Sequence, residues 1–573
     1  MVQGVRLVPD AGLRLRVAKW GAPTGNRAGG TTRGTALRRR ATAPVFTSLA
    51  AVAALAVVAG SLTAGVAAAS PSLPTDTQQQ VSAERPIPVL PTHSCTEQLM
   101  VHDFANSYGA PYNGTYTPPA GCPGPWAKVV LTLTSTVSGT QFDRDVYVAL
   151  GHAVVLDGST SEPCCTGNAS TWTVQRDVTD VAPLLGTTQP VQVELDNVND
   201  ATYTGVYHTI VSLTFYETDA THPAPAGPDT VLPVSSNGNG GPMLGIGTDG
   251  QQVGTQVMFP TDMTHLTAEV FADAHGPCEE FWWADPGDCA GTPYREVAVY
   301  LDGHLAGAAP AYPVTYTGAG GPGLWEPIPS PRAWNLRPYD LDLTPFVATL
   351  TDGAPHSVTI GVLSSSLATG DFWALAANLL VTRDPKGADT RGGLLSVTAS
   401  AEPTQNITDP TGQGVPYLDD ASHTLTFSGY TINGNRRVDT TVTESMGENA
   451  RQAVLADTAT WTWDYSTKTA ADGHTTVSTN HADYGITSDL LTTYDLTDNA
   501  TSSSTVDGVR TGWSSMAEHM RTADATGIVF NGAEEEDYGY ADNSGACYHH
   551  VLASQAGEIT VDNVDALLCP SAR

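Results

Sequence analysis

An aspartate and an arginine, Asp143 and Arg144, stand at the start of a segment that the chain repeats later. The run from Arg144 (Arg-Asp-Val-Tyr-Val-Ala-Leu-Gly) matches the run from Arg295 (Arg-Glu-Val-Ala-Val-Tyr-Leu-Asp). Arginine is present in both copies, which suits a structural role, whereas Asp143 corresponds to Tyr294. A carboxylate that is present in only one copy is a candidate acid–base group. An Asp–Arg pair is also a common structural ion pair, and spacing alone does not separate the two interpretations.

A second group of carboxylates lies beside aromatic residues. Glu279 and Glu280 follow Cys278 and precede Trp282 and Trp283. Aromatic rings exclude water from a neighbouring carboxyl group, which raises its pKa and suits proton transfer. Tryptophan rings also stack on sugar rings. Two glutamates in such a place can equally belong to a loop at the edge of the core, so these residues alone predict only a protein able to bind sugar.

The elements that must position these residues are β-strands. Apolar and polar side chains alternate over residues 126–134, 145–150, 191–196 and 209–215, among others, which is typical of strands with one buried face. No amphipathic helix of several turns is evident after residue 69. Each copy of the repeat has about eight such segments, which favours jelly-roll topology. The predicted fold class is all-β, with two tandem antiparallel jelly-roll-type β-sandwiches plus a C-terminal β-rich domain.

Changes in composition divide the chain of 573 residues into domains of ordinary size. A Pro- and Gly-rich stretch separates the two repeat copies, and the last third is rich in Thr, Ser and Asp. The predicted order is a signal peptide (1–69), a linker (70–92), the first jelly roll (93–221), the second jelly roll (222–389) and the C-terminal β-rich domain (390–573).

The first 69 residues resemble an export signal. Three arginines (38–40) precede an apolar stretch over 45–60, and small residues at 67–69 offer a cleavage site. An uncleaved membrane anchor is the alternative. The net charge of −33 disfavours binding to nucleic acid and to anionic membranes. We therefore expect a secreted protein with no nucleic-acid partner and no stable membrane association after cleavage.

The eight cysteines suit disulfides in an exported protein. None forms a C-x-x-C pair, which argues against structural zinc, and no metal or cofactor is expected. The local pairings that we expect are Cys95–Cys122, Cys278–Cys289 and Cys547–Cys569, which leave the adjacent Cys164 and Cys165. Eight cysteines allow 105 pairings, so other connectivities stay open.

Several motifs, in order over about residues 93–385, resemble those of the peptide-N-glycanase A family, glycoamidases that release N-glycans from asparagine. They are Gln141-Phe-Asp-Arg, Ser159-Thr-Ser-Glu-Pro, Glu280-Phe-Trp-Trp-Ala-Asp-Pro, Pro293-Tyr-Arg-Glu-Val, Leu301-Asp-Gly-His-Leu-Ala-Gly, Pro313-Val-Thr-Tyr-Thr-Gly and Asp340-Leu-Asp-Leu-Thr-Pro-Phe. Cys164 and Cys165 depart from the family pattern. The family is similar in layout to peptide-N-glycosidase F, which implies two jelly rolls with the active site at their junction.

The resemblance implies roles for individual residues. Phe142-Asp143-Arg144 is similar to the context of the catalytic aspartate of peptide-N-glycosidase F, and Cys278-Glu-Glu280 is similar to the context of its essential glutamate. Asp143 and Glu280 are therefore the candidate catalytic residues. The candidates for substrate binding or charge stabilisation are Arg144, Glu162, Asp196, Glu279, Trp282, Trp283 and Arg332. Glu279 is the alternative to Glu280, and the matches of Asp196 and Arg332 are loose.

The resulting hypothesis is an exported, acid-active peptide N-glycanase that cleaves the β-amide bond between asparagine and N-acetylglucosamine. Its partners would be N-glycosylated peptides or proteins. An acidic pH optimum is expected because crowded carboxylates raise one another's pKa. Two alternatives stay open: a noncatalytic glycan-binding protein, and a glycosidase that uses paired carboxylates on the glycosidic bond.

Overall fold

The computed structural model describes residues 5–10, 14–19, 77–162, 169–234, 241–276, 279, 294–317, 326–363, 371–408, 417–452, 457–489, 493–522 and 532–564. Strands dominate these residues, and the prediction of an all-β fold is confirmed. The α-helices that they contain are single turns, α1 (Ala182–Leu185) and α2 (Val347–Leu350). Each follows a short 3-10 turn, η1 (Thr179–Val181) or η2 (Thr344–Phe346).

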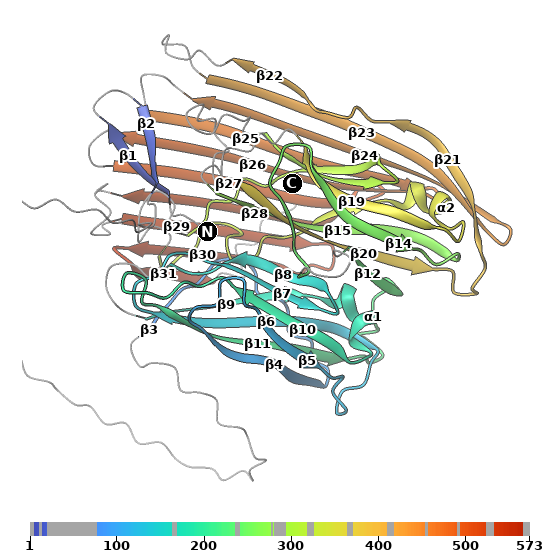
Figure 1. The fold of residues 1–573 in the computed structure, drawn as a ribbon, viewed down its shortest axis with the longest axis horizontal. Helices are drawn as coiled ribbons and strands as arrows, with labels where there is room; N and C mark the ends of the chain where they lie inside the picture. Colours follow the sequence, from blue (N-terminus) through green and yellow to red (C-terminus); the bar gives the residue numbers. More distant parts are fainter. Residues whose placement is uncertain are drawn as a thin grey trace, which may run out of the picture. The chain divides into compact units, whose positions relative to one another are not determined.

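The first sandwich, blue to cyan in Figure 1, has one sheet in the order β5-β10-β7-β8 and another in the order β3-β9-β6-β11-β4. Its strands are β3 (Thr77–Gln79), β4 (Ser94–Phe104), β5 (Tyr112–Tyr116), β6 (Trp126–Ser138), β7 (Asp145–Leu150), β8 (Ala153–Ser159), β9 (Ala169–Asp177), β10 (Gln189–Leu195) and β11 (Val206–Glu217). Alternate side chains of β11, including Val211, Leu213 and Phe215, are fully buried between the sheets, as the period of two requires.

The second sandwich repeats this plan. One sheet has the order β12-β20-β15-β18 with β13 beside β20, and the other has the order β14-β19-β16-β17. Its strands are β12 (Thr230–Val234), β13 (Leu244–Ile246), β14 (Gln252–Met258), β15 (Met263–His275), β16 (Glu296–Leu301), β17 (His304–Pro310), β18 (Tyr339–Asp342), β19 (Pro355–Leu363) and β20 (Phe372–Arg383). The matched runs of the sequence repeat form β7 and β16, which occupy the same place in their sheets.

The C-terminal region is one eleven-stranded antiparallel sheet, orange to red in Figure 1. Its order is β21-β23-β24-β25-β26-β27-β28-β29-β30-β31, with β22 beside β23. The strands are β21 (Thr390–Thr398), β22 (Thr404–Thr408), β23 (Tyr417–Asn433), β24 (Arg436–Gln452), β25 (Asp457–Ala471), β26 (His474–Asp489), β27 (Thr493–Val506), β28 (Val509–Thr522), β29 (Gly532–Asp542), β30 (Cys547–Gln555) and β31 (Glu558–Val564).

This large sheet packs on the second sandwich. Its buried Trp461, Trp463 and Tyr484 share one hydrophobic core with residues of β15, β17 and β20. The indole of Trp463 donates to the carbonyl of Pro310 at 3.3 Å, and Glu444 accepts the Ala308 backbone N–H at 2.9 Å. Burying aromatic area is the main stabilising contribution at such an interface.

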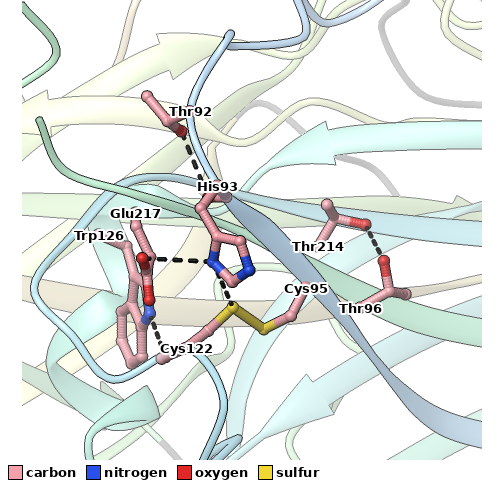
Figure 2. Close-up of a disulfide and its surroundings, with 8 residues drawn as sticks. All are labelled: Thr92, His93, Cys95, Thr96, Cys122, Trp126, Thr214 and Glu217. Carbon is pink, nitrogen blue, oxygen red and sulfur yellow. Dashed lines mark hydrogen bonds and ion pairs between the residues drawn. A yellow bond between two sulfur atoms is a disulfide. The ribbon is translucent and has the colours of Figure 1, made fainter.

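The disulfide predicted between Cys95 and Cys122 is present (Figure 2). Around it, the Trp126 indole donates to the Cys122 carbonyl at 2.9 Å, and His93 forms an ion pair of 3.3 Å with Glu217. Cys547 is also disulfide-bonded. The remaining cysteines (Cys164, Cys165, Cys278, Cys289 and Cys569) lie outside the described residues.

The N-terminal region is described only in part. Residues predicted as signal peptide include the hairpin β1 (Val5–Asp10) and β2 (Arg14–Lys19), while the apolar stretch over 45–60 lies outside the described residues. Part of the predicted linker forms β3, which pairs in parallel with β9. Ala83, also in the linker, is fully buried. Within the described residues, no helix has the length and hydropathy needed to span a membrane.

Candidate active site at the junction of the two sandwiches

The two sandwiches meet through an apolar contact. Tyr147, Ala149 and Val154 of the first sandwich form one buried cluster with Phe271 and Ala376 of the second. Because side chains alternate along a strand, the residues on β7 and β8 that share a face with this cluster also point to the junction. The same holds for β15 and β20 on the other side.

Polar contacts tie the same faces together. Asn378 donates to the Val154 carbonyl at 2.7 Å and to Glu269 at 2.8 Å. Arg176 of the first sandwich forms an ion pair with Glu269 and lies 4.8 Å from the centroid of the Phe271 ring. These contacts cross from one sandwich to the other, which favours one fixed relation between the facing strands.

At one end of this face, carboxylates from both sandwiches converge. Asp145 shares its face of β7 with Tyr147, and Asp157 of β8 stands opposite Tyr147 in the strand register. Asp273 shares its face of β15 with Phe271. The side chains of Asp157 and Asp273 are 2% exposed. We call Asp143, Asp145, Asp157, Asp273 and His275 the junction cluster.

His275 connects the two sandwiches within the junction cluster. Its Nδ1 lies 3.5 Å from Asp145 Oδ2, and its Nε2 lies 3.2 Å from Asp273 Oδ2. The ring stacks on Phe372 with centroids 4.6 Å apart. Burial opposes the charged form, but Asp145 and Asp273 outweigh it and raise the pKa of His275 to about 10. The residue is therefore an imidazolium held between Asp145 and Asp273.

Ligand-type atoms of Asp145, Asp273 and His275 lie within 4.8 Å of one another. Both ring nitrogens of His275 face these carboxyl groups. A second such group contains Cys122, whose sulfur is in the disulfide with Cys95. The second group therefore does not fit a metal site.

The pKa values of three carboxyl groups in the junction cluster are raised. Burial, and then the charge of Asp145, raise the pKa of Asp143 to about 7, although Arg144 acts in the opposite direction. Burial raises the pKa of Asp145 to about 6, against the pull of His275. Burial also raises the pKa of Asp157 well above its ordinary value. Neighbouring carboxyl groups with different pKa values suit separate acid and base roles.

Arg144, next to Asp143, is held by its surroundings. Its backbone N–H donates to Thr160 Oγ1 at 2.8 Å, its guanidinium donates to Gln141 at 2.5 Å, and the side chain lies 5.6 Å from the Tyr203 ring centroid. The residue is 5% exposed. Arg144 therefore keeps a fixed positive charge beside Asp143.

The other predicted site residues are placed as follows. Glu162 is buried, and Glu279 is buried with its carboxylate accepting the Gly276 N–H at 2.8 Å, beside His275. Asp196 follows β10, is half-buried and accepts the Gly109 N–H at 2.8 Å. Burial, and to a lesser degree Asp145, raise its pKa. Glu280, Trp282 and Trp283 lie outside the described residues.

Arg332 is not part of the junction cluster. Its guanidinium lies 3.7 Å from the centroid of the Tyr312 ring and acts on the buried Asp498 of the C-terminal sheet. It lines a cavity of about 20 Å³, which has room for a water molecule but not for a sugar. The structure therefore brings Asp143, Arg144 and Glu279 to the neighbourhood of His275 and places Arg332 beside another group.

Sequence reasoning missed Asp145, Asp157, Asp273 and His275. One signal was available for Asp145, because the second repeat copy also has an acidic residue, Glu296, at that position. Asp157 and the two residues of β15 carried no local signal. Their proximity comes from the strand register and from the packing of one sandwich on the other.

Comparisons with known proteins identify the family of the chain. Residues 74–400 match the family model described as peptide N-acetyl-beta-D-glucosaminyl asparaginase amidase A. Over 373 residues the chain is 30% identical to peptide-N4-(N-acetyl-beta-glucosaminyl)asparagine amidase A of Prunus dulcis, an alignment that covers 60% of this chain and 64% of the relative. The chain thus spans just under two thirds of the length of that relative.

Two solved structures of PNGF-II, in space groups C2 and P21, also resemble the chain. They are 15% and 14% identical, have a TM-score of 0.37, and are covered to 65% and 66% by an alignment over 51% of this chain. The family model itself covers more than half of the chain, and its range contains both sandwiches. The chain belongs to the peptide N-acetyl-beta-D-glucosaminyl asparaginase amidase A family.

Proposed function

We propose that this protein is a secreted amidase that hydrolyses the β-amide bond between asparagine and N-acetylglucosamine in N-glycosylated peptides and proteins. Family membership and the name of the Prunus dulcis relative support this activity. The observation that carries the proposal is the pair Asp143 and Asp145, two carboxyl groups in different environments at the junction of the sandwiches. Export is supported by the basic, apolar and small residues of the first 69 positions.

Hydrolysis of an amide needs a base for the attacking water and an acid for the departing nitrogen. Asp143 carries a proton in mild acid because its pKa is raised to about 7. It is the acid, and it donates to the scissile amide. Asp145, ionised beside His275 and 29% exposed, is the base that takes a proton from the water.

The remaining groups bind substrate and balance charge. Arg144 offers a fixed positive charge near the oxygen of the tetrahedral intermediate. Glu280, or its neighbour Glu279, would bond the sugar or the water from the second sandwich, and Trp282 and Trp283 would stack on the sugar core. The products are a peptide with aspartate in place of asparagine and a glycosylamine that later loses ammonia. Water and acid–base groups suffice for this reaction, and no cofactor is proposed.

The test is mass spectrometry of one N-glycopeptide incubated with the protein in H₂¹⁸O. Attack on the amide carbonyl should convert asparagine to aspartate and place one ¹⁸O in the new carboxyl group. An endoglycosidase would instead leave one N-acetylglucosamine on an unlabelled asparagine, and a glycan-binding protein would return the peptide unchanged. Either of these outcomes would exclude the proposed activity.

The rate should depend on pH with a maximum in mild acid. Asp145 must be ionised, so kcat/KM should rise as pH increases through about 6. Asp143 must be protonated, so kcat/KM should fall again as pH increases through about 7. Because the two groups interact, the two apparent pKa values of the pH profile belong to the pair and not to either residue alone. A profile measured between pH 4 and 9 with glycopeptide well below KM checks this, and an optimum at pH 8 or above would contradict it.

A further inference from the structure

The contact of His275 with Asp145 has a counterpart elsewhere in the chain. Asp145 and Glu296 hold the same position in the sequence repeat, each directly after the shared arginine. Asp145 receives His275 from the second sandwich, and Glu296 receives His423 from the C-terminal sheet. In both cases the domain that follows along the chain provides the imidazole.

The two pairs differ in their surroundings. The Glu296–His423 pair is closed, because Nδ1 lies 2.7 Å from the carboxylate and the side chains are 0% and 2% exposed. Tyr294 donates to Glu296, and Ser400 lies 2.9 Å from His423 Nε2. In the first copy of the repeat, Asp143 occupies the position that Tyr294 has in the second copy. The Asp145 side chain remains 29% exposed. Asp145 of the first pair is therefore accessible to substrate, and the second pair serves as an internal reference for a purely structural role.

Titratable and charged groups of both sandwiches act on His275 or on its partners Asp145 and Asp273. The first sandwich provides Asp143, Asp145 and Asp157 with Arg144, and the second provides Asp273, Glu279 and Tyr316. Tyr316 donates to Asp273, so that carboxylate accepts hydrogen bonds from both Tyr316 and His275. Acidic groups outnumber the cations, and they cannot all be ionised in a buried junction. His275 acts most directly on Asp145 and Asp273, because its two ring nitrogens lie 3.5 Å and 3.2 Å from these groups.

We propose that His275 is a positioning residue that holds Asp145 as a carboxylate, so that the proton shared by Asp143 and Asp145 rests on Asp143. The second sandwich thereby sets the protonation of the catalytic pair in the first. This inference rests on the proposed amidase function. It predicts that loss of the imidazolium moves the proton from Asp143 toward Asp145, because a carboxylate without its counter-charge becomes more basic.

The experiment compares His275→Gln with His423→Gln in the full chain, using the pH dependence of kcat/KM on a glycopeptide. His275→Gln should lower the maximal kcat/KM at least tenfold. It should also raise the lower apparent pKa of the profile, which is about 6, by about one pH unit, so that the lower and upper apparent pKa values coincide. His423→Gln should lower the melting temperature by several degrees and leave both limbs in place. His275→Lys, which keeps a positive charge, should keep the limbs separate.

Asp145→Asn is the second variant, which stays informative where His275→Gln folds poorly. It should abolish the limb at about pH 6, and adding His275→Gln to it should produce no further shift of the remaining limb. The inference would be overturned if the pH profile of His275→Gln superimposed on that of the active wild type. It would also be overturned if the double variant showed a further shift in its remaining apparent pKa. An inactive wild type would instead refute the proposed function, so the two failures are distinguishable.

Discussion

Asp143→Asn should reduce kcat/KM for glycopeptide hydrolysis by roughly 10²–10⁴-fold, the range expected for loss of an acid–base group. Asparagine keeps the shape of the side chain and removes its proton. The melting temperature should be unchanged or slightly higher, because burial already makes the ionised form of Asp143 unfavourable. Activity and stability should therefore separate in this variant.

Asp498→Asn is the matched control. Asp498 is buried in the C-terminal sheet, and burial raises its pKa to about 7, as for Asp143. Removing it should have a similar effect on stability and little effect on kcat/KM in mild acid. Both variants would be compared by thermal melting and by the initial rate of glycan release. Full activity in folded Asp143→Asn would remove Asp143 from the mechanism.

The fold class could be predicted because its signal is local. Buried and exposed side chains alternate along the strands, as in β11, and the sequence repeat shows that two sandwiches of this kind follow one another. The place of Asp143 could be predicted for a related reason, since one residue distinguishes the two copies. The expectation that Arg144 has a structural role agrees with its hydrogen bonds to Gln141 and Thr160, which hold its charge beside Asp143.

The partners of Asp143 could not be predicted, because they come from strands far apart in the sequence. Asp157 meets Tyr147 only through the register of β7 and β8, and His275 meets Asp145 only when the sandwiches pack together. Neither the strand register nor the packing of the sandwiches can be read from the spacing of residues or the composition of the chain. A local motif match made Arg332 a candidate site residue, and tertiary packing places its guanidinium over Tyr312.

A row of buried carboxyl groups crosses the C-terminal sheet. Asp498 stands opposite Glu518, and Glu518 stands opposite Glu536, in three adjacent strands. They are 2%, 3% and 0% exposed. Arg332 acts on Asp498, while Glu536 accepts hydrogen bonds from the backbone of Ala83 and, at 3.1 Å, from Ser82. Like charges directly opposite each other in a buried sheet are unfavourable.

Burial, with help from neighbouring carboxylates, raises the pKa of these groups. It is raised to about 7 for Asp498, to about 8 for Glu536, and well above the ordinary value for Glu518. Between the ordinary carboxyl pKa of about 4 and these raised values, the folded chain binds more protons than the unfolded chain. The stability that the row contributes is therefore complete near pH 4 and is lost as pH rises through about 7 to 8.

The melting temperature should consequently be higher at pH 5 than at pH 8, by at least about 5 °C. Each carboxyl group contributes about 1.4 kcal/mol for every pH unit over which it is protonated only in the folded chain. Glu518→Gln and Glu536→Gln mimic the protonated form, so they should stabilise the protein at pH 8 and change its stability little at pH 5. The difference in melting temperature between pH 5 and pH 8 should therefore become smaller.

The control is Glu535→Gln, which removes one exposed charge from the same strand as Glu536 and should leave this difference in melting temperature unchanged. Since the net charge of −33 also destabilises the compact state at high pH, Glu535→Gln separates that general repulsion from the buried row. If Glu535→Gln and Glu536→Gln reduced the difference in melting temperature between pH 5 and pH 8 equally, the effect would come from overall charge, which would contradict the role of the buried row.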